Sequence, residues 1–186
     1  MIARRRAGLP AMARIYSSPL VRTRETAGAL AKALDLEVVE VPGLADCDAG
    51  EWAGAALKQL AKKPEWPTVV HYPSGFRFPG GESMAEMQYR AVSTVKGLAD
   101  AHEGQTVVVV SHADPIKAVL ADALGMHFDQ FQRIVVAPAS VSAISYGEVG
   151  PAVMLVNWTG QPGPAPGEEA AGKGTTGAGA PARSRR

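Results

Sequence analysis

The clearest hydrophobic pattern in the chain is an uninterrupted run of valines at residues 107–110. Consecutive β-branched apolar residues predict a strand buried on both faces, as in a parallel sheet. After a short turn that contains His112, apolar residues recur at helical spacing as far as Gly125, with Asp114 as the expected N-cap and Lys117 on the expected exposed face. The pattern therefore predicts a strand, a tight turn and a helix.

Strand and helix patterns alternate along most of the chain. The first predicted helix starts at Ser18, and a capping box at Ser83 and Glu86 opens a second one that runs to about Gly104. The predicted strands are residues 13–17, 36–41, 107–110, 133–136, 141–146 and 153–158. This alternation predicts an α/β fold with a largely parallel sheet, which the last strand closes in antiparallel orientation.

Residues 55–81 show no sustained period and are rich in proline and aromatic residues. A loop of this length in a compact domain is usually a functional lid, and the alternative is a short helix hidden in the stretch. Aromatic side chains in and before it are interpreted as packing residues rather than substrate contacts: Trp52, Trp66, Phe76 and Phe78.

Composition predicts one globular domain at residues 1–158 and a disordered tail at 159–186, because the tail has no large apolar residue. The net charge of +1 gives no reason to expect a nucleic acid or an anionic membrane as partner. The single cysteine, Cys47, excludes an internal disulfide and favours a cytoplasmic location, and no segment approaches the ~20 apolar residues of a membrane span.

Candidate chemistry gathers where the predicted strands end. Arg22 falls in the first turn of a helix and His112 in the turn after the valine strand, and an acidic loop at 46–51 follows another strand. Carboxyl ends of parallel strands meet at one sheet edge, so these groups are expected to lie together. A guanidinium and an imidazole beside a helix N-terminus favour a phosphate site. A purely structural His112 and a metal pair with Asp114 are the alternatives, and no His or Cys cluster supports the metal.

Two motifs, SSPLVRTRETA at 17–27 and VSHADPIKA at 110–118, resemble the second-arginine and second-histidine motifs of the histidine phosphatase (phosphoglycerate mutase-like) superfamily. LADCDAGEWAG at 44–54 resembles its acid loop, and PGGES at 79–83 resembles a later loop before a helix. These motifs come in the family's order, and the resemblance extends from about Arg6 to Trp158. It is strongest to an actinobacterial branch of predicted phosphomutases.

This resemblance implies a three-layer α/β/α fold, small phosphate-ester substrates and phosphatase or phosphomutase activity through a phosphohistidine. It implies no metal and no cofactor, and it leaves the oligomeric state open. Residues 55–81 are where substrate specificity is expected to lie.

The resemblance also assigns roles to single residues. Arg22 matches the phosphate-clamping arginine and His112 the second histidine, with Ala113 beside it where the family commonly has glycine. Asp46 falls where the family usually has a glutamate that donates a proton. Because aspartate is one methylene shorter, Glu51 and Glu82 are the alternative acids.

The family's nucleophilic histidine lies in an Arg-His-Gly motif at the end of its first strand. No histidine of this sequence has that context, since the four are His71, His102, His112 and His127. The first strand is therefore expected to be missing from a chain that starts late. The alternative is a catalytically inactive protein of the same fold that binds a phosphate ligand.

Overall fold

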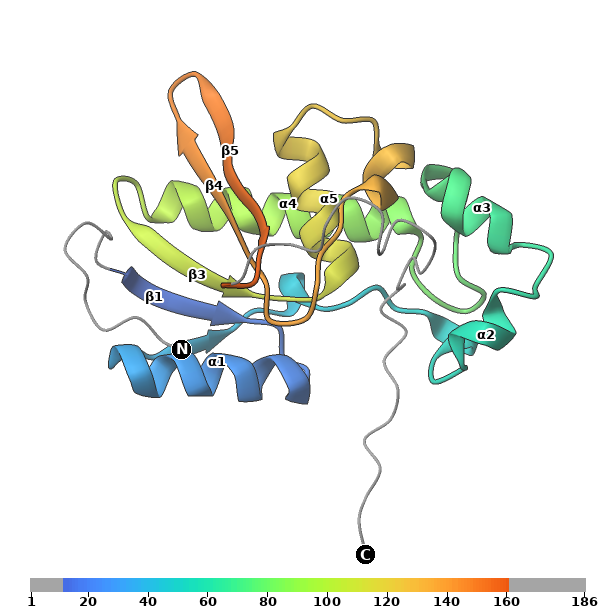
Figure 1. Ribbon diagram of the computed structural model, residues 1–186, viewed down its shortest axis with the longest axis horizontal. Coiled ribbons are helices and arrows are strands. Elements are labelled where there is room, and N and C mark those ends of the chain that lie inside the picture. The colour runs from blue at the N-terminus through green and yellow to red at the C-terminus, as the bar shows by residue number, and fades with distance from the viewer. Residues whose placement is uncertain (1–11, 161–186) are drawn as a thin grey trace, which may run out of the picture.

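A three-stranded parallel sheet forms the centre of the molecule, with strand order β2-β1-β3. The computed structural model describes residues 12–160, so the N-terminal residues and nearly all of the expected tail lie outside the described part. The strands are β1 (Met12–Ser17), β2 (Val38–Glu40) and β3 (Thr106–Val110). Ile15 of β1 lies opposite Val38 and Val108. All three carboxyl ends therefore lie at one edge (Figure 1).

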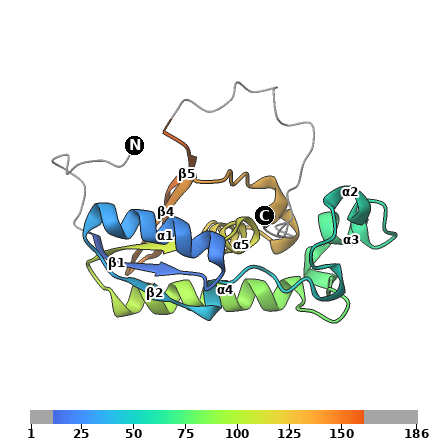
Figure 2. The ribbon, with the colours of Figure 1, turned by 90° about the horizontal axis from the view of Figure 1, so that it is seen from below.

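Helices cover both faces of this sheet, as Figures 1 and 2 show. Helix α1 (Val21–Leu34) lies on one face and α4 (Met84–Ala101) on the other. Helix α5 (Ala113–Ala123) follows β3 and packs against α4. The expected α/β fold with a mostly parallel sheet is confirmed. The capping box is also confirmed, since the Ser83 hydroxyl accepts from the Glu86 N–H at 3.1 Å and the Glu86 carboxylate accepts from the Ser83 N–H at 2.8 Å.

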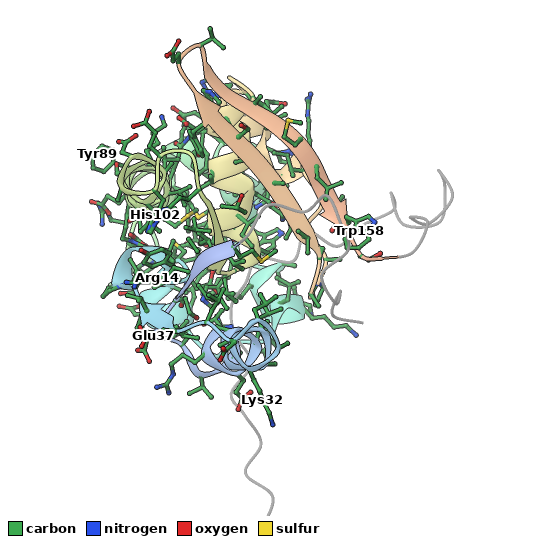
Figure 3. All side chains as sticks on the ribbon, turned by 90° about the vertical axis from the view of Figure 1, so that its left-hand side faces the viewer. Arg14, Lys32, Glu37, Tyr89, His102 and Trp158 are labelled. Atoms are coloured by element: carbon green, nitrogen blue, oxygen red, sulfur yellow. The ribbon has the colours of Figure 1, made fainter. Side chains whose placement is uncertain are left out.

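The last two strands form a sheet of their own. β4 (Val141–Gly147) and β5 (Gly150–Trp158) make an antiparallel hairpin that does not pair with β1, β2 or β3. The expectation that residues 153–158 close the main sheet is therefore wrong. Trp158, labelled in Figure 3, is more than half exposed at the end of this hairpin, away from Tyr89 on α4.

Residues 133–136 were expected to form a strand, and this is wrong too. The chain forms the 3-10 helix η4 (Phe128–Arg133) and then an irregular segment. Apolar side chains recur every three residues here, which suits a 3-10 helix and brings Phe128, Phe131 and Ile134 into the core. The segment is apolar, as predicted, but its buried residues recur every three positions and not every two.

Three expectations about helix ends and faces are corrected. The N-cap of α5 is His112, with extended backbone, and Asp114 is a buried residue of the first turn. The N-cap of α1 is Leu20, not Ser18. Lys117 is only 3% exposed, because η4 packs over the face of α5 on which it lies.

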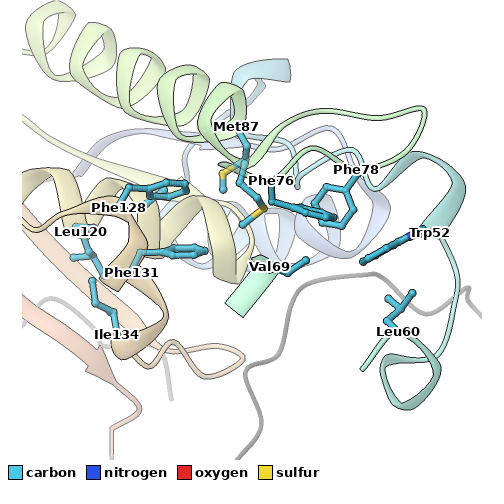
Figure 4. Packing of buried hydrophobic residues seen from close by; sticks show 13 residues of the cluster. Trp52, Leu60, Val69, Phe76, Phe78, Met87, Leu120, Phe128, Phe131 and Ile134 are labelled. Atoms are coloured by element: carbon cyan, nitrogen blue, oxygen red, sulfur yellow. The ribbon is translucent and has the colours of Figure 1, made fainter. Parts of the chain in front are cut away.

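Residues 55–81 contain short helices rather than one open loop. These are α2 (Leu57–Leu60), α3 (Trp66–His71) and the 3-10 turn η3 (Pro73–Gly75). Trp52, Phe76 and Phe78 pack together with ring centroids 5.0–5.6 Å apart (Figure 4). The packing role is confirmed for these rings, and Trp66 lies partly buried against the same cluster. Each buried ring stabilises this lobe by roughly 2–3 kcal/mol.

None of the helices between residues 12 and 160 has both the length and the apolar character needed to cross a membrane.

Candidate active site

The carboxyl edge of the parallel sheet brings together three side chains that are far apart in sequence. Arg22 is the second residue of α1, His112 directly precedes α5, and Asp46 follows the 3-10 turn η1 (Pro42–Leu44) after β2. The Ser18 N–H donates to the Val110 carbonyl at 2.9 Å, which fixes the ends of β1 and β3 to each other. The expected convergence of these groups at one edge is therefore observed.

Arg22 bonds both of the other side chains. Its Nε donates to Nδ1 of His112 at 3.1 Å, and its terminal NH2 group donates to Oδ2 of Asp46 at 2.7 Å. The same Asp46 oxygen lies 3.6 Å from the His112 Nδ1. About half of the Arg22 side chain is exposed, whereas Asp46 is 9% exposed, so the guanidinium faces solvent and the carboxyl does not.

Hydrogen bonds determine the tautomer of His112. Because Nδ1 accepts from Arg22, Nε2 carries the proton and donates to the Ser18 hydroxyl at 2.8 Å. Burial, together with the positive charges of Arg22 and Arg90, lowers the pKa of His112 to about 4. The imidazole is therefore neutral at pH 7, and the imidazolium is favoured only when a nearby anion offsets the two arginines.

The pKa of Asp46 is shifted in the opposite direction, upward. The pKa of its carboxyl is raised to about 7, because burial, helped by the negative charge of Asp114, outweighs the opposing effects of Arg22 and the Cys47 N–H. A carboxyl with this pKa exchanges its proton near neutral pH, which is the range a general acid needs.

The loop that carries Asp46 is held by Arg90 of α4. The guanidinium forms a two-pronged ion pair with Glu82, at 2.9 and 2.8 Å. It also donates to three backbone carbonyls of the loop, those of Gly43, Ala45 and Asp46, at 2.9–3.3 Å. Every bond of this cation is made within the protein, so its role is to fix the position of Asp46 rather than to bind a ligand.

The two alternative acids are Glu51, in the acid loop, and Glu82, in the loop before α4. Glu82 uses both oxygens on Arg90 and accepts from the Asp48 N–H at 3.3 Å. Glu51 is exposed, in the 3-10 turn η2 (Gly50–Trp52). Among the described residues, neither is hydrogen-bonded to Arg22, whereas Asp46 is.

Two other features complete the site. Ala113 is the first residue of α5 and lies directly beside His112. Gly50 has a φ of +50°, and a Cβ there would lie 2.2 Å from the Pro79 carbonyl oxygen. Only glycine allows the acid loop and the loop before α4 to approach so closely.

Three residues of the site were not predicted: Ser18, Arg90 and Asp114. Ser18 and Asp114 lie inside the two motifs quoted above, but both were interpreted as helix caps, and Asp114 was otherwise considered only as a metal partner of His112. Arg90 lies in no motif, and its partners are 8 to 47 residues away in sequence. A basic residue on the helix behind the acidic loop is the only signal in the sequence that points to it.

The other histidines of the described residues do not join this site. His102 bonds Tyr16 and Gln105, and His127 caps η4. A surface hollow of about 240 Å³ contains none of the three central side chains; its lining residues are Val70, His71, Asp129, Gln130, Gln132 and Arg133. Between residues 12 and 160, no group of three or more His, Cys, Asp or Glu side chains is arranged to hold a metal ion.

An arginine, a histidine and a protonatable carboxyl lie together at the carboxyl edge of the parallel sheet, an arrangement that can bind an anion with an acid beside it. The sequence model of the histidine phosphatase superfamily (branch 1) matches residues 2–159. The chain belongs to this superfamily.

Curated relatives support the same class. The chain is 35% identical over 147 residues to phosphoserine phosphatase 1 of Hydrogenobacter thermophilus, covering 78% of this chain and 70% of that protein. It is 36% identical over 158 residues to a bifunctional protein of Mycobacterium tuberculosis, covering 84% of this chain but only 43% of that protein. A probable phosphoglycerate mutase of Yersinia enterocolitica is 29% identical over 136 residues, with 72% and 63% covered.

Solved structures show the same fold. A Bacillus stearothermophilus protein superposes with a TM-score of 0.73 at 23% identity, covering 79% of this chain and 74% of that one. A phosphoserine phosphatase of Entamoeba histolytica, solved in complex with phosphoserine, superposes with a TM-score of 0.70 at 25% identity, with 78% and 73% covered.

Proposed function

We propose that this chain binds a small phosphate monoester at Arg22, His112 and Asp46 and takes part in phosphatase or phosphomutase chemistry. The observation that carries the proposal is the bond from Arg22 Nε to His112 Nδ1, with the Asp46 carboxyl 3.6 Å from the same nitrogen. A cation, an imidazole and an acid are thereby in contact at one place, and together they match the needs of a phosphoryl group and its leaving oxygen.

Binding of the phosphoryl group uses donors that the protein can redirect. The half-exposed guanidinium of Arg22 presents N–H groups to two phosphoryl oxygens, and the Nε2–H of His112 turns from the Ser18 hydroxyl to a third. The N–H of Ala113 at the start of α5 adds a backbone donor where the helix dipole favours negative charge. The bound anion also raises the pKa of His112, so that the imidazole becomes the cation that stabilises the transferring group.

Asp46 supplies the proton. Because its pKa is raised to about 7, the Asp46 carboxyl still holds a proton in part of the molecules at neutral pH, which an ordinary aspartate does not. That proton goes to the ester oxygen as its bond to phosphorus breaks, which releases a neutral alcohol. In the net reaction the phosphoryl group passes to the oxygen of water, or to a second hydroxyl group in the mutase reaction, and this acceptor releases its own proton to solvent. Glu82 is the weaker alternative because its carboxylate is fixed to Arg90.

Phosphoserine is the first substrate to test. A curated relative is named a phosphoserine phosphatase, and so is a structural neighbour solved with phosphoserine. The relatives also include a probable phosphoglycerate mutase, so hydrolysis and phosphoryl transfer between hydroxyl groups are both tested.

A second function is favoured by one specific observation. A phosphohistidine mechanism needs an attacking imidazole nitrogen in line with the leaving oxygen, and His112 is the one histidine that the described residues bring to Arg22 and Asp46. With His112 engaged as a clamp, this stretch of chain supports binding of a phosphate ester without turnover. The second candidate is therefore a non-catalytic phosphate-ligand protein.

One experiment separates the two. Calorimetry with inorganic phosphate measures binding by the 186-residue protein, and release of phosphate from phosphoserine and p-nitrophenyl phosphate measures turnover. Both candidates predict binding that His112→Ala weakens about 10- to 100-fold. Turnover that disappears in His112→Ala supports the enzyme, and binding without turnover supports the ligand-binding protein. Turnover that survives His112→Ala, or an unchanged affinity, contradicts the assigned site.

A further inference from the structure

The carboxyl of Asp46 occupies part of the surface that the proposed anion site needs. Its Oδ2 accepts from a terminal NH2 group of Arg22 at 2.7 Å and lies 3.6 Å from Nδ1 of His112. The Nε of Arg22 donates to the same His112 nitrogen, so the edge of the guanidinium that faces the histidine makes both of its bonds inside the protein. One carboxyl oxygen therefore lies between the two groups that are proposed to hold a phosphoryl group.

The exposure of the two partners decides how an anion meets this oxygen. About half of the Arg22 side chain is exposed, whereas Asp46 is 9% exposed. An anion that comes from solvent thus reaches the guanidinium first, and it can bind beside His112 only where the Asp46 oxygen now lies. Two negative charges that share one place repel each other strongly in a partly buried site.

Charged side chains reach the Asp46 loop from every neighbouring element; they are Arg22 of α1, Arg90 of α4, Glu82 before α4, and His112 and Asp114 at the start of α5. Arg90 bonds Glu82 and the Asp46 carbonyl rather than the Asp46 carboxyl. His112 is neutral without an anion, and Asp114 favours the protonated form of Asp46. Among these groups, Arg22 is therefore the one charged partner to which the Asp46 carboxyl is bonded.

We propose that Asp46 is the resting counterion of Arg22, and that an anion binds beside His112 in exchange for the negative charge of Asp46, which is lost when the carboxylate takes up a proton from solvent. This exchange rests on the proposed anion site at Arg22 and His112. The protonated carboxyl no longer repels the anion, and its O–H can donate to an anion oxygen. Anion binding and protonation of Asp46 therefore strengthen each other by the same factor.

Calorimetry with sulfate tests the exchange, because sulfate is a tetrahedral dianion whose charge does not change between pH 5.5 and pH 8.5. At pH 8.5, where Asp46 is ionised, Asp46→Asn is expected to bind sulfate about 5- to 10-fold more tightly than the wild type, because a competing negative charge is gone. At pH 5.5 the wild-type carboxyl is already protonated, so the two proteins are expected to have the same affinity.

The matched control is Asp48→Asn, which removes the same charge from the same loop. Asp48 is exposed, and its carboxylate accepts from the Gly50 N–H at 3.0 Å. This variant is expected to bind sulfate like the wild type at both pH values. A gain in affinity as large as that of Asp46→Asn would reveal a general effect of charge and would overturn the exchange.

A second measurement uses the wild-type protein alone and does not depend on the folding of a variant. Carbon-detected NMR follows the titration of the Asp46 carboxyl with and without saturating sulfate. The midpoint is expected to rise by up to about one pH unit, since a tenfold coupling corresponds to one unit.

Two results overturn the inference: equal or weaker sulfate binding by Asp46→Asn at pH 8.5, or an Asp46 midpoint that saturating sulfate leaves unchanged or lowers. Failure of the proposed function appears differently. At pH 5.5 the Asp46 carboxyl is protonated and no longer competes, so a wild-type protein that binds no sulfate there would contradict the anion site itself.

Discussion

The two arginine–carboxylate pairs of the site region have the same chemistry and different surroundings. Arg90 and Glu82 are joined by two bonds, and the remaining donors of Arg90 are taken by backbone carbonyls. Arg22 and Asp46 share a single bond, and half of the Arg22 side chain faces solvent. An arginine whose donors are all used inside the protein braces a loop, whereas one that keeps free donors at a surface can bind an anion.

The comparison predicts that removing the Arg90 side chain has the largest effect on stability. Arg90→Ala leaves Glu82 without its cation and frees three loop carbonyls, so the free energy of unfolding is expected to fall by about 3–4 kcal/mol. Urea unfolding measures this. The matched control is Arg77→Ala, an exposed arginine paired with Glu86, for which a much smaller loss of unfolding free energy is expected, because solvent screens an exposed ion pair. Equal losses of unfolding free energy in the two variants would contradict the distinction between an arginine that holds a loop in place and an exposed ion pair.

A second, smaller effect is the pH dependence that Asp46 gives to the free energy of unfolding. Asp46 binds a proton more tightly in the folded state, with a pKa of about 7 against an ordinary value of 3.8. Its stabilising contribution is therefore complete below pH 3.8 and is lost as the pH rises through 7. Between pH 5 and pH 8, the wild-type protein is expected to lose about 2–3 kcal/mol more of its unfolding free energy than Asp46→Asn. Identical pH profiles would show that this carboxyl is ionised like an ordinary aspartate.

His112 gives a third effect, with the opposite sign. Its pKa is about 4 in the folded protein against an ordinary 6.5, so stability is complete above pH 6.5 and is lost as the pH falls through 4. Nitrogen NMR is expected to show a neutral ring at pH 5.5 with its proton on Nε2. Addition of inorganic phosphate is expected to move the midpoint upward. A ring that is already charged at pH 6 in the absence of phosphate would contradict the burial argument.

The smallest expected effect on stability belongs to Arg22. Because its side chain is half exposed and has one bond to Asp46, Arg22→Ala is expected to change the free energy of unfolding by less than about 1 kcal/mol. A loss of unfolding free energy as large as that of Arg90→Ala would mean that Arg22 stabilises the fold and is not available to bind a ligand. Thermal unfolding of the two variants side by side gives the answer.

The sequence predicted the parts of this fold that depend on local pattern. Strong periodicity identified β1, β3, α1, α4 and α5, and parallel topology then placed Arg22, Asp46 and His112 at one edge. Long-range packing was not predictable in this way. Lys117 was assigned to an exposed face because a helical wheel contains no information about η4, which covers it.

Two further differences have the same origin. The hairpin has an ordinary strand pattern, and nothing in it says which sheet the strands join. Arg90 bonds to residues on both sides of a long loop, and no local spacing indicates such partners. The domain limits at 1–158 and the roles of the site residues stay predictions.

The central claim is that Arg22 and His112 form an anion site, and its most direct test is a titration with orthovanadate, which mimics a transferring phosphoryl group. The wild-type protein is expected to bind it, and Arg22→Ala is expected to bind about 10- to 100-fold more weakly, since a charged hydrogen bond is lost. Arg24→Ala, on the same helix and paired with the exposed Glu40, is the matched control and is expected to bind like the wild type. Equal affinity in all three proteins would contradict the account.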